Sequence, residues 1–147
     1  MNVRDINVLE HIIGYCEEIA QTIKSFDDKL ETLKTNHIYK NAASMCVLQI
    51  GELTTHLSKD FVGKNTEIPW SNIKRMRDIA AHHYGKFSME KLHETIMFDI
   101  PALKVYCQNL LDRQFVETRH TLSLFCFGKY YFPYELFWQN NLSVVFA

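Results

Sequence analysis

The chain has 147 residues, of which 47% are hydrophobic and 22% are charged. This length and composition are typical of one globular domain with an ordinary hydrophobic core. The formal net charge of −1 excludes a strongly basic surface over the whole protein, so any site for a polyanion must be local.

Apolar residues recur every three or four positions up to about residue 113, which predicts a series of helices. The first helix has one apolar stripe, formed by Ile6, Leu9, Ile13, Cys16, Ile19, Ile23 and Phe26. A short helix is expected next, through Leu30 and Leu33, with Asp27 or Asp28 as its N-cap.

A long helix is expected from about His37 to Ser58, and its middle is apolar almost all round. That pattern predicts the most buried helix of the protein. Gly51 lies within it and costs about 1 kcal/mol of helix propensity, which is tolerable where a neighbouring helix must approach closely.

Residues 59–69 are expected to form a loop, because Gly63 and Pro69 interrupt the pattern. A fourth helix is predicted from about Trp70 to His83, with Gly85 as its C-terminal stop. Ser88 is a suitable N-cap for a fifth helix, which Pro101 either kinks or restarts. No segment has the alternating pattern of a strand. Residues 1–114 are therefore predicted to form an all-α, up-and-down bundle of about five helices.

Residues 115–147 differ from the bundle, because they contain ten of the 19 aromatic residues and show no clear helical stripe. They are compatible with an added helix or hairpin, with a partner-binding arm, or with an incidental extension of the reading frame. We expect an atypical C-terminal extension of unknown role. So apolar a segment should pack on the bundle or on a second subunit.

The four cysteines lie far apart and form no C-x-x-C pair: Cys16, Cys46, Cys107 and Cys126. This spacing predicts reduced, mostly buried thiols and disfavours structural zinc. Glu10 and His11 interrupt the first apolar stretch, so it does not resemble a signal peptide, and the uncharged runs near the C-terminus are too short to span a bilayer. We expect a cytoplasmic protein with no cofactor and no membrane partner.

The predicted fourth helix has polar residues on a face opposite its apolar arc. At 100° per residue, Ile73, Met76, Ile79, Ala80 and His83 share the apolar arc. This favours a buried, structural role for His83. Arg75, Asp78 and His82 fall together on the opposite side, while Arg77 and Tyr84 share a flank with Ala81.

Asp78 and His82 are four residues apart, so the carboxylate can reach the imidazole ring. A carboxylate raises the pKa of a histidine and a nearby arginine lowers it, and these opposed effects suit a group that exchanges protons near neutral pH. The same residues also fit a solvated helix face with one ion pair. The geometry of a single helix leaves both interpretations open.

The segment from Arg77 to Tyr84 has the form R-x-x-x-x-H-x-Y, which resembles the motif of the HepT-like toxins of the HEPN superfamily. The surrounding sequence resembles the same family in the "IGEL" segment (residues 50–53), in "EIPW" (residues 67–70) and in residues 76–103. The resemblance covers about residues 4–113, with every element in order.

This resemblance implies a homodimeric helical bundle that acts as a metal-independent endoribonuclease, with two motifs facing each other across a cleft. RNA is the implied substrate, and DNA is not expected. The 2′-hydroxyl would attack the adjacent phosphorus and leave 2′,3′-cyclic phosphate and 5′-hydroxyl ends. His82 is the implied acid and base, and Arg77 would neutralise the phosphoryl oxygens. Asp78 and Arg75 are the supporting candidates, because the helical wheel places them on the same side as His82.

HepT-like proteins are toxins of type VII-like toxin–antitoxin pairs, so the resemblance also implies a partner. That partner would be an MntA-like minimal nucleotidyltransferase, an antitoxin that transfers AMP to the motif tyrosine, which is Tyr84 here. The added phosphate charge would repel RNA.

The chain departs from the family at one motif position. Asp78 stands where the family commonly has asparagine, and its carboxylate would weaken the attraction for RNA. The alternative interpretation is a non-catalytic HEPN-type binding module that holds a nucleotidyltransferase partner.

Overall fold

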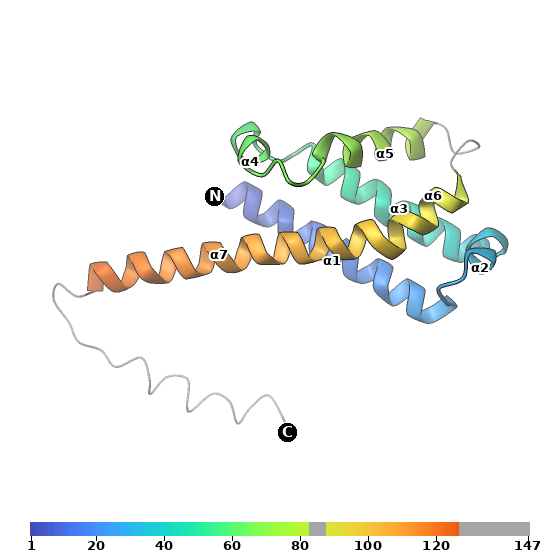
Figure 1. Ribbon diagram of the computed structural model, residues 1–147, viewed down its shortest axis with the longest axis horizontal. Coiled ribbons are helices and arrows are strands. Elements are labelled where there is room, and N and C mark those ends of the chain that lie inside the picture. Colours follow the sequence, from blue (N-terminus) through green and yellow to red (C-terminus); the bar gives the residue numbers. More distant parts are fainter. Residues whose placement is uncertain (83–87, 127–147) are drawn as a thin grey trace, which may run out of the picture. The chain divides into compact units, whose positions relative to one another are not determined.

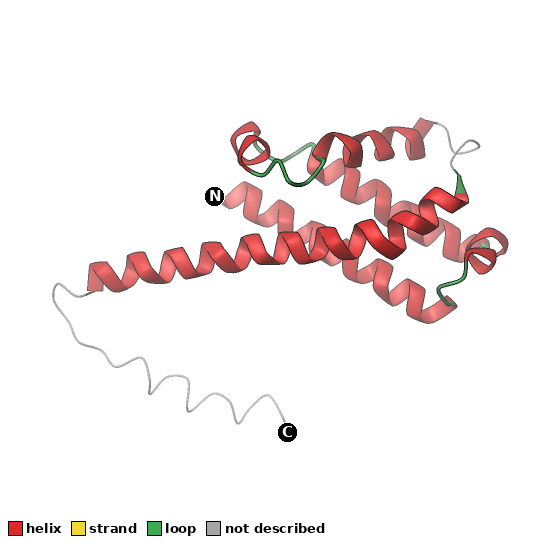
Figure 2. Cartoon of the chain, in the orientation of Figure 1, coloured by secondary structure: helices red, strands yellow, loops and turns green. Residues whose placement is uncertain are grey.

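The computed structural model describes residues 1–82 and 88–126, with the side chains of residues 1–75, 77 and 88–114. Every regular element in these ranges is helical, as predicted (Figure 2). The elements in chain order are α1 (Val3–Phe26), α2 (Leu30–Thr35), α3 (His37–Thr54), α4 (Lys59–Lys64), α5 (Trp70–His82), α6 (Met89–Glu94), the π-helical turn η1 (Thr95–Asp99) and α7 (Ile100–Cys126).

Helix α3 is the centre of the bundle, because it packs against both α1 and α5 (Figure 1). Helix α2 contacts α3 and α6. The first part of α7 joins the same core through Leu103 and Cys107, and Lys104 forms an ion pair of 3.1 Å with Glu17 of α1. Side chains from six elements are fully buried in this core: Leu9, Ile12, Ile19, Leu33, Tyr39, Ile50, Leu92, Ile96 and Cys107.

Helix α3 has more buried residues than α1, α2, α4 or α6, as predicted, but it is not buried on every side. One face is buried and includes Ala43, Val47 and Ile50, but Met45 is 56% exposed. The helix also ends at Thr54 rather than near Ser58, since the N–H of Thr55 bonds back to the carbonyls of Glu52 and Leu53.

The predicted loop at residues 59–69 is wrong in its first half, where α4 forms. Ser58 caps this helix by accepting a hydrogen bond from the N–H of Phe61, and the Phe61 side chain is buried. Asp5 of α1, only 2% exposed, accepts bonds from the N–H and hydroxyl of Ser58 at 2.8 and 2.7 Å. A cap and a buried anchor therefore outweigh the cost of Gly63 in a helix.

The expected N-cap of α2 is also displaced. Lys29 occupies the cap position, but its side chain makes no capping hydrogen bond. Asp27 lies two residues earlier, and its carboxylate accepts bonds from the N–H of Lys29 and the hydroxyl of Thr32, each at 3.0 Å. It stabilises the start of α2 from outside the helix.

Ser88 caps α6 as predicted, by accepting a bond from the N–H of Lys91. The chain stays helical through Pro101, so the expected restart behind Asp99 takes the form of a change from π-helical to α-helical hydrogen bonding. Proline has no N–H and clashes with the carbonyl four residues before it. The chain widens into η1 just before Pro101, where the N–H of Ile100 bonds to the carbonyl of Thr95, five residues back.

Helix α7 continues to Cys126, so the helix that was expected to end near residue 113 runs on into the C-terminal extension. No glycine or proline occurs between residues 102 and 126, so nothing in the local sequence ends the helix earlier. The chain divides into two compact units, residues 1–112 and 113–147. The aromatic residues after position 126 lie outside the described part.

Cys16, Cys46 and Cys107 are free and buried, as expected. In the described ranges, no helix is both long enough and apolar enough to cross a membrane.

Candidate active site

The motif lies on α5, whose first residue is firmly anchored. Trp70 is 6% exposed, and its indole N–H donates a 2.7 Å hydrogen bond to the carbonyl oxygen of Asn65. Its ring packs against Phe61 of α4 with the centroids 5.9 Å apart. This anchor fixes where α5 begins and therefore sets the position of each later motif residue along the helix.

Helices α3 and α5 approach each other most closely at Gly51. A Cβ atom at position 51 would overlap the Cβ of Arg77 and would lie 3.1 Å from the carbonyl oxygen of Ile73. The overlap with the Cβ of Arg77 is closer than real Cβ atoms approach, so a side chain at position 51 would force the two helices to shift. The structure confirms the expectation that Gly51 marks a close helix contact.

The approach at Gly51 brings Glu52 to the motif arginine. The Nε and Nη2 atoms of Arg77 lie 2.7 and 2.5 Å from the same carboxylate oxygen, Oε2 of Glu52. The side chains are 29% and 40% exposed, so the pair lies at the edge of the core. Charge-assisted bonds of this length hold a guanidinium in one orientation.

Glu52 is a functional candidate that the sequence reasoning did not assign. The signal was present, because the "IGEL" segment places a glycine and a glutamate side by side in a buried helix. Pairing that glutamate with Arg77 required knowing that α3 and α5 are neighbours. Glu52 and Arg77 come together only in the folded chain.

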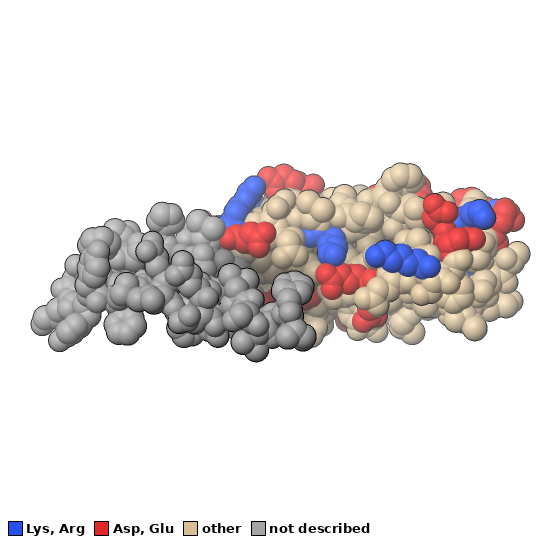
Figure 3. All heavy atoms as spheres, turned by 90° about the horizontal axis from the view of Figure 1, so that it is seen from below, with Lys and Arg blue, Asp and Glu red and all other residues tan. Residues whose placement is uncertain are grey.

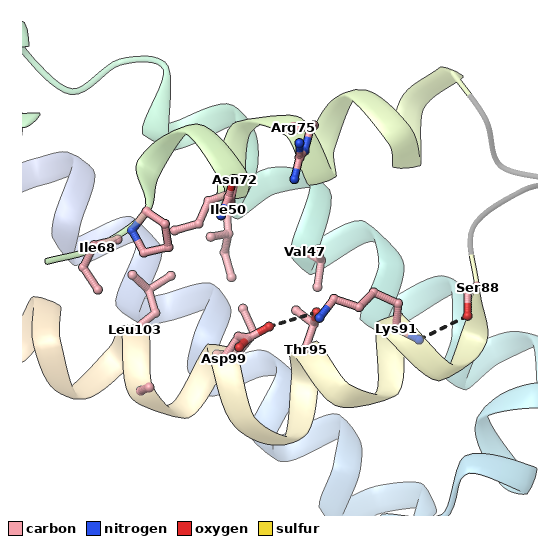
Figure 4. Close-up of a pocket in the computed structure, with 14 residues that line it drawn as sticks. Val47, Ile50, Ile68, Asn72, Arg75, Ser88, Lys91, Thr95, Asp99 and Leu103 are labelled. Atoms are coloured by element: carbon pink, nitrogen blue, oxygen red, sulfur yellow. Dashed lines mark hydrogen bonds between the residues drawn. The ribbon is translucent and has the colours of Figure 1, made fainter. Parts of the chain in front are cut away.

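Arg75 serves a different surface from Arg77. It is exposed, as the helical wheel predicted, and it lines a pocket of about 630 Å³ between α3, α5 and the segment from α6 to α7 (Figure 4). The two arginines of α5 therefore have different neighbours, because Arg77 contacts Glu52 and Arg75 lines this pocket.

The remaining motif residues are placed only in part. Asp78 and His82 belong to α5, and His82 is its last residue, but their side chains are outside the described set. His83, Tyr84 and Gly85 lie outside the described residues. The contact between Asp78 and His82, the burial of His83 and the role of Tyr84 thus stay predictions.

Charges are mixed over the described surface. On the face shown in Figure 3, lysine and arginine side chains alternate with acidic ones, and no broad basic patch appears among the coloured residues. Within the described ranges, no group of three or more His, Cys, Asp or Glu side chains is placed to hold a metal ion. On this described surface, a polyanion would be attracted by individual lysine and arginine side chains at particular positions, because no broad basic patch is present.

The sequence model of the family described as "Ribonuclease HepT-like" matches residues 12–110. The chain belongs to this family. Both the Gly51–Glu52 pair and the motif helix α5 fall within the matched region, so the HepT-like part of the chain contains the site described above.

Curated relatives agree with this membership. A candidate RNase of Caldanaerobacter subterraneus subsp. tengcongensis is 30% identical over 108 residues, which cover 72% of this chain and 93% of the relative. A protein of Thermococcus cleftensis named as a candidate ribonuclease HepT is 33% identical over 99 residues, or 61% and 86% of the two chains. A candidate RNase of Methanocaldococcus jannaschii is 31% identical over 105 residues, which cover 71% of this chain and 89% of the relative. No solved structure matches the chain significantly.

Proposed function

We propose that this HepT-like chain is a metal-independent endoribonuclease whose reaction takes place at α5. The observation that carries the proposal is the pair formed by Arg77 and Glu52, which holds a motif guanidinium in one orientation at the edge of the core. A cation fixed before substrate binds stabilises developing phosphoryl charge without reorganising during the reaction. Family membership supplies the substrate class, RNA.

The reaction needs no water or metal in its first step. The 2′-hydroxyl of a ribose attacks the adjacent phosphorus, and the bond to the 5′-oxygen of the next nucleotide breaks. His82 accepts the proton of the attacking hydroxyl or supplies the proton of the leaving oxygen. Arg77 neutralises the phosphoryl oxygens. The products are a 2′,3′-cyclic phosphate end and a 5′-hydroxyl end.

We further propose that the working form is a homodimer. Arg77 and His82 are five residues apart, so their positions are about 140° apart around the axis of α5. Two α5 helices facing each other would surround one phosphate more completely than a single helix. A shared cleft would also double the local positive charge, which a chain of net charge −1 otherwise lacks.

The proposed regulation is covalent. An MntA-like minimal nucleotidyltransferase acts as the antitoxin and transfers AMP to the hydroxyl of Tyr84, two residues after His82. Each added phosphate brings negative charge to the cleft and repels RNA. The chain is then the toxin of a type VII-like toxin–antitoxin pair.

The nuclease proposal is tested with purified protein and RNA in the presence of EDTA. We expect cleavage in EDTA, loss of at least about 100-fold in rate for His82→Ala and for Arg77→Ala, and cyclic phosphate ends by mass spectrometry. His11→Ala and Arg4→Ala are matched controls, because both side chains are exposed on α1. Cleavage that survives His82→Ala rejects the assignment. Absence of cleavage, with the nucleotidyltransferase still bound, favours the non-catalytic binding module.

The modification proposal needs co-expression with a nucleotidyltransferase from the same operon. The intact mass of the chain should rise by whole AMP units, and Tyr84→Phe should abolish the rise. Tyr15→Phe, a change on α1, is the control. An AMP-sized increase that persists in Tyr84→Phe contradicts this role of Tyr84.

A further inference from the structure

The pocket beside α5 combines an apolar floor with a polar rim. Its volume is about 630 Å³, within the range of sites that bind small organic molecules. The floor consists of aliphatic side chains from α3, α5, α7 and the segment before α5, among them Val47, Ile50, Ile68, Ile73 and Leu103. Such a floor favours a flat, weakly polar group over a fully hydrated one.

The rim carries two cations on opposite walls. Figure 4 shows Arg75 on the α5 side and Lys91 on the α6 side. Arg75 has no ion pair with any described residue. Lys91 has a 2.9 Å bond to Glu94, with both side chains more than half exposed, and pairs of this kind exchange partners at little cost. An anionic group at the rim would therefore meet two available cations.

The pocket lies within about two helical turns of the position of His82 on α5. Arg75 and the position of His82 are seven residues apart on α5, so they lie on one side of the helix and about 10 Å apart along its axis. That distance corresponds to only a few nucleotides of single-stranded RNA, whose bases are readily turned out of the stack.

We propose that the pocket binds one nucleotide of the RNA substrate next to the cleavage site, with its base on the aliphatic floor and its phosphate between Arg75 and Lys91. This inference rests on the proposed ribonuclease function and adds a subsite to it. Arg75 is then a residue that determines which bond is cut, while Arg77 acts at the bond itself.

Two polar side chains in the pocket give the subsite a base preference. The carboxylate of Asp99 accepts a bond from the hydroxyl of Thr95 at its Oδ2 atom, and as a carboxylate it can only accept. Bases with an exocyclic amino group supply a donor to it, whereas uracil presents carbonyl oxygens on either side of its single N–H. Asn72, also in the lining, can donate or accept. Adenine, guanine and cytosine should bind better than uracil.

The first test measures binding of AMP, GMP, CMP and UMP to the full chain by NMR, which needs no cleavage. UMP should bind most weakly. Arg75→Ala should weaken AMP binding by about tenfold, the effect of one lost charge-assisted contact. Ala102→Trp fills the pocket from an exposed position, so it should abolish AMP binding.

The matched controls lie on the same two helices outside the pocket lining. Lys74→Ala removes one positive charge from the residue next to Arg75, and Val105→Trp places a large side chain at another exposed position of α7. Both should bind AMP as the wild type does. Equal binding by Ala102→Trp and wild type, or no nucleotide binding by the wild type, overturns the pocket assignment.

The second test sequences the ends produced from an RNA of mixed sequence. The wild type should show a biased base at one position near each cut, with uridine depleted. Ala102→Trp should flatten this bias and raise KM at least about tenfold while kcat stays within about twofold. A bias unchanged in Ala102→Trp overturns the subsite. Absence of any cleavage by the wild type overturns the proposed function instead, and the nucleotide titrations still decide the pocket.

Discussion

The pair of Arg77 and Glu52 shows how a weak stabilising contact can matter for a reaction. A pair with these exposures contributes about 1 kcal/mol or less to the free energy of unfolding. The pair also fixes the orientation of Arg77, because two bonds to one carboxylate oxygen hold the guanidinium against α3. A guanidinium has five N–H donors, so the two bonds to Glu52 do not by themselves exhaust its capacity to contact a phosphate.

Replacement of Glu52 by glutamine should therefore lower activity more than stability. For Glu52→Gln we expect the rate of RNA cleavage to fall by about 10- to 100-fold, because a guanidinium displaced by about 1 Å no longer meets the phosphoryl oxygens. The free energy of unfolding, from urea denaturation, should change by less than about 1 kcal/mol.

The control for this experiment is Glu17→Gln, which removes an exposed ion pair with Lys104 far from the motif in sequence. Glu52→Asp, which keeps the charge, should restore part of the activity. If Glu52→Gln cleaves as fast as the wild type, Glu52 does not position Arg77 for the reaction.

The three buried thiols have raised pKa values, which predicts lower stability at alkaline pH. Burial raises the pKa of Cys16 and of Cys107 to about 12. Burial, and the Glu18 carboxylate beside it, raise the pKa of Cys46 to about 11. An unfolded chain releases these protons near pH 9, so above that pH the folded state binds more protons than the unfolded state and stability falls as pH rises.

We therefore expect the thiol contribution to stability to be complete below about pH 9 and to disappear between about pH 9 and pH 12. Urea denaturation across this range measures it. At pH 8 the three thiols should resist iodoacetamide in the folded protein and react after unfolding. Rapid alkylation of all three in the native state would contradict their burial.

At the scale of elements, α3 and α5 make a close contact at Gly51. Gly51 would gain about 1 kcal/mol of helix propensity as alanine, but its new Cβ would overlap Arg77 and crowd the backbone of α5. Overpacking of this kind typically costs about 1–3 kcal/mol, so the steric term is the larger.

Gly51→Ala should therefore destabilise the protein by about 1 kcal/mol or slightly more, measured by thermal or urea unfolding. Gly14→Ala is the matched control, since Gly14 is also helical and no atom lies within 4 Å of its would-be Cβ. That change should stabilise by about 0.5–1 kcal/mol. Opposite signs are expected, and two stabilising substitutions would refute the close contact.

At the scale of the whole molecule, the hydrophobic core formed by the residues whose burial the structure describes lies in the first unit. Every residue of the buried cluster, from Val8 to Leu111, lies within residues 1–112. We propose that residues 1–114 form a domain that folds without the aromatic extension. A chain ending at residue 114 should unfold cooperatively, with a Tm within about 5 °C of the full chain, by circular dichroism. A non-cooperative melt would show that the extension is needed for folding.

Most helices of the fold are predictable from the sequence, because an apolar stripe every three or four residues is a local property of the chain. The errors fall where local signals conflict. Helix α4 forms in spite of Gly63 because a capping serine and a buried phenylalanine support it. Helix α7 extends further than expected because residues 102–126 contain no glycine or proline, so no local signal ends the helix.

The motif on α5 and the family to which the chain belongs follow from the sequence alone, since both depend on residue types at fixed spacings along one helix. Only the tertiary structure decided that Glu52 pairs with Arg77 and that Arg75 faces a pocket instead. Partners 25 residues apart meet because Gly51 lets α3 and α5 come together. A helical wheel gives the direction in which a residue faces, but it does not identify the neighbouring helix on that side.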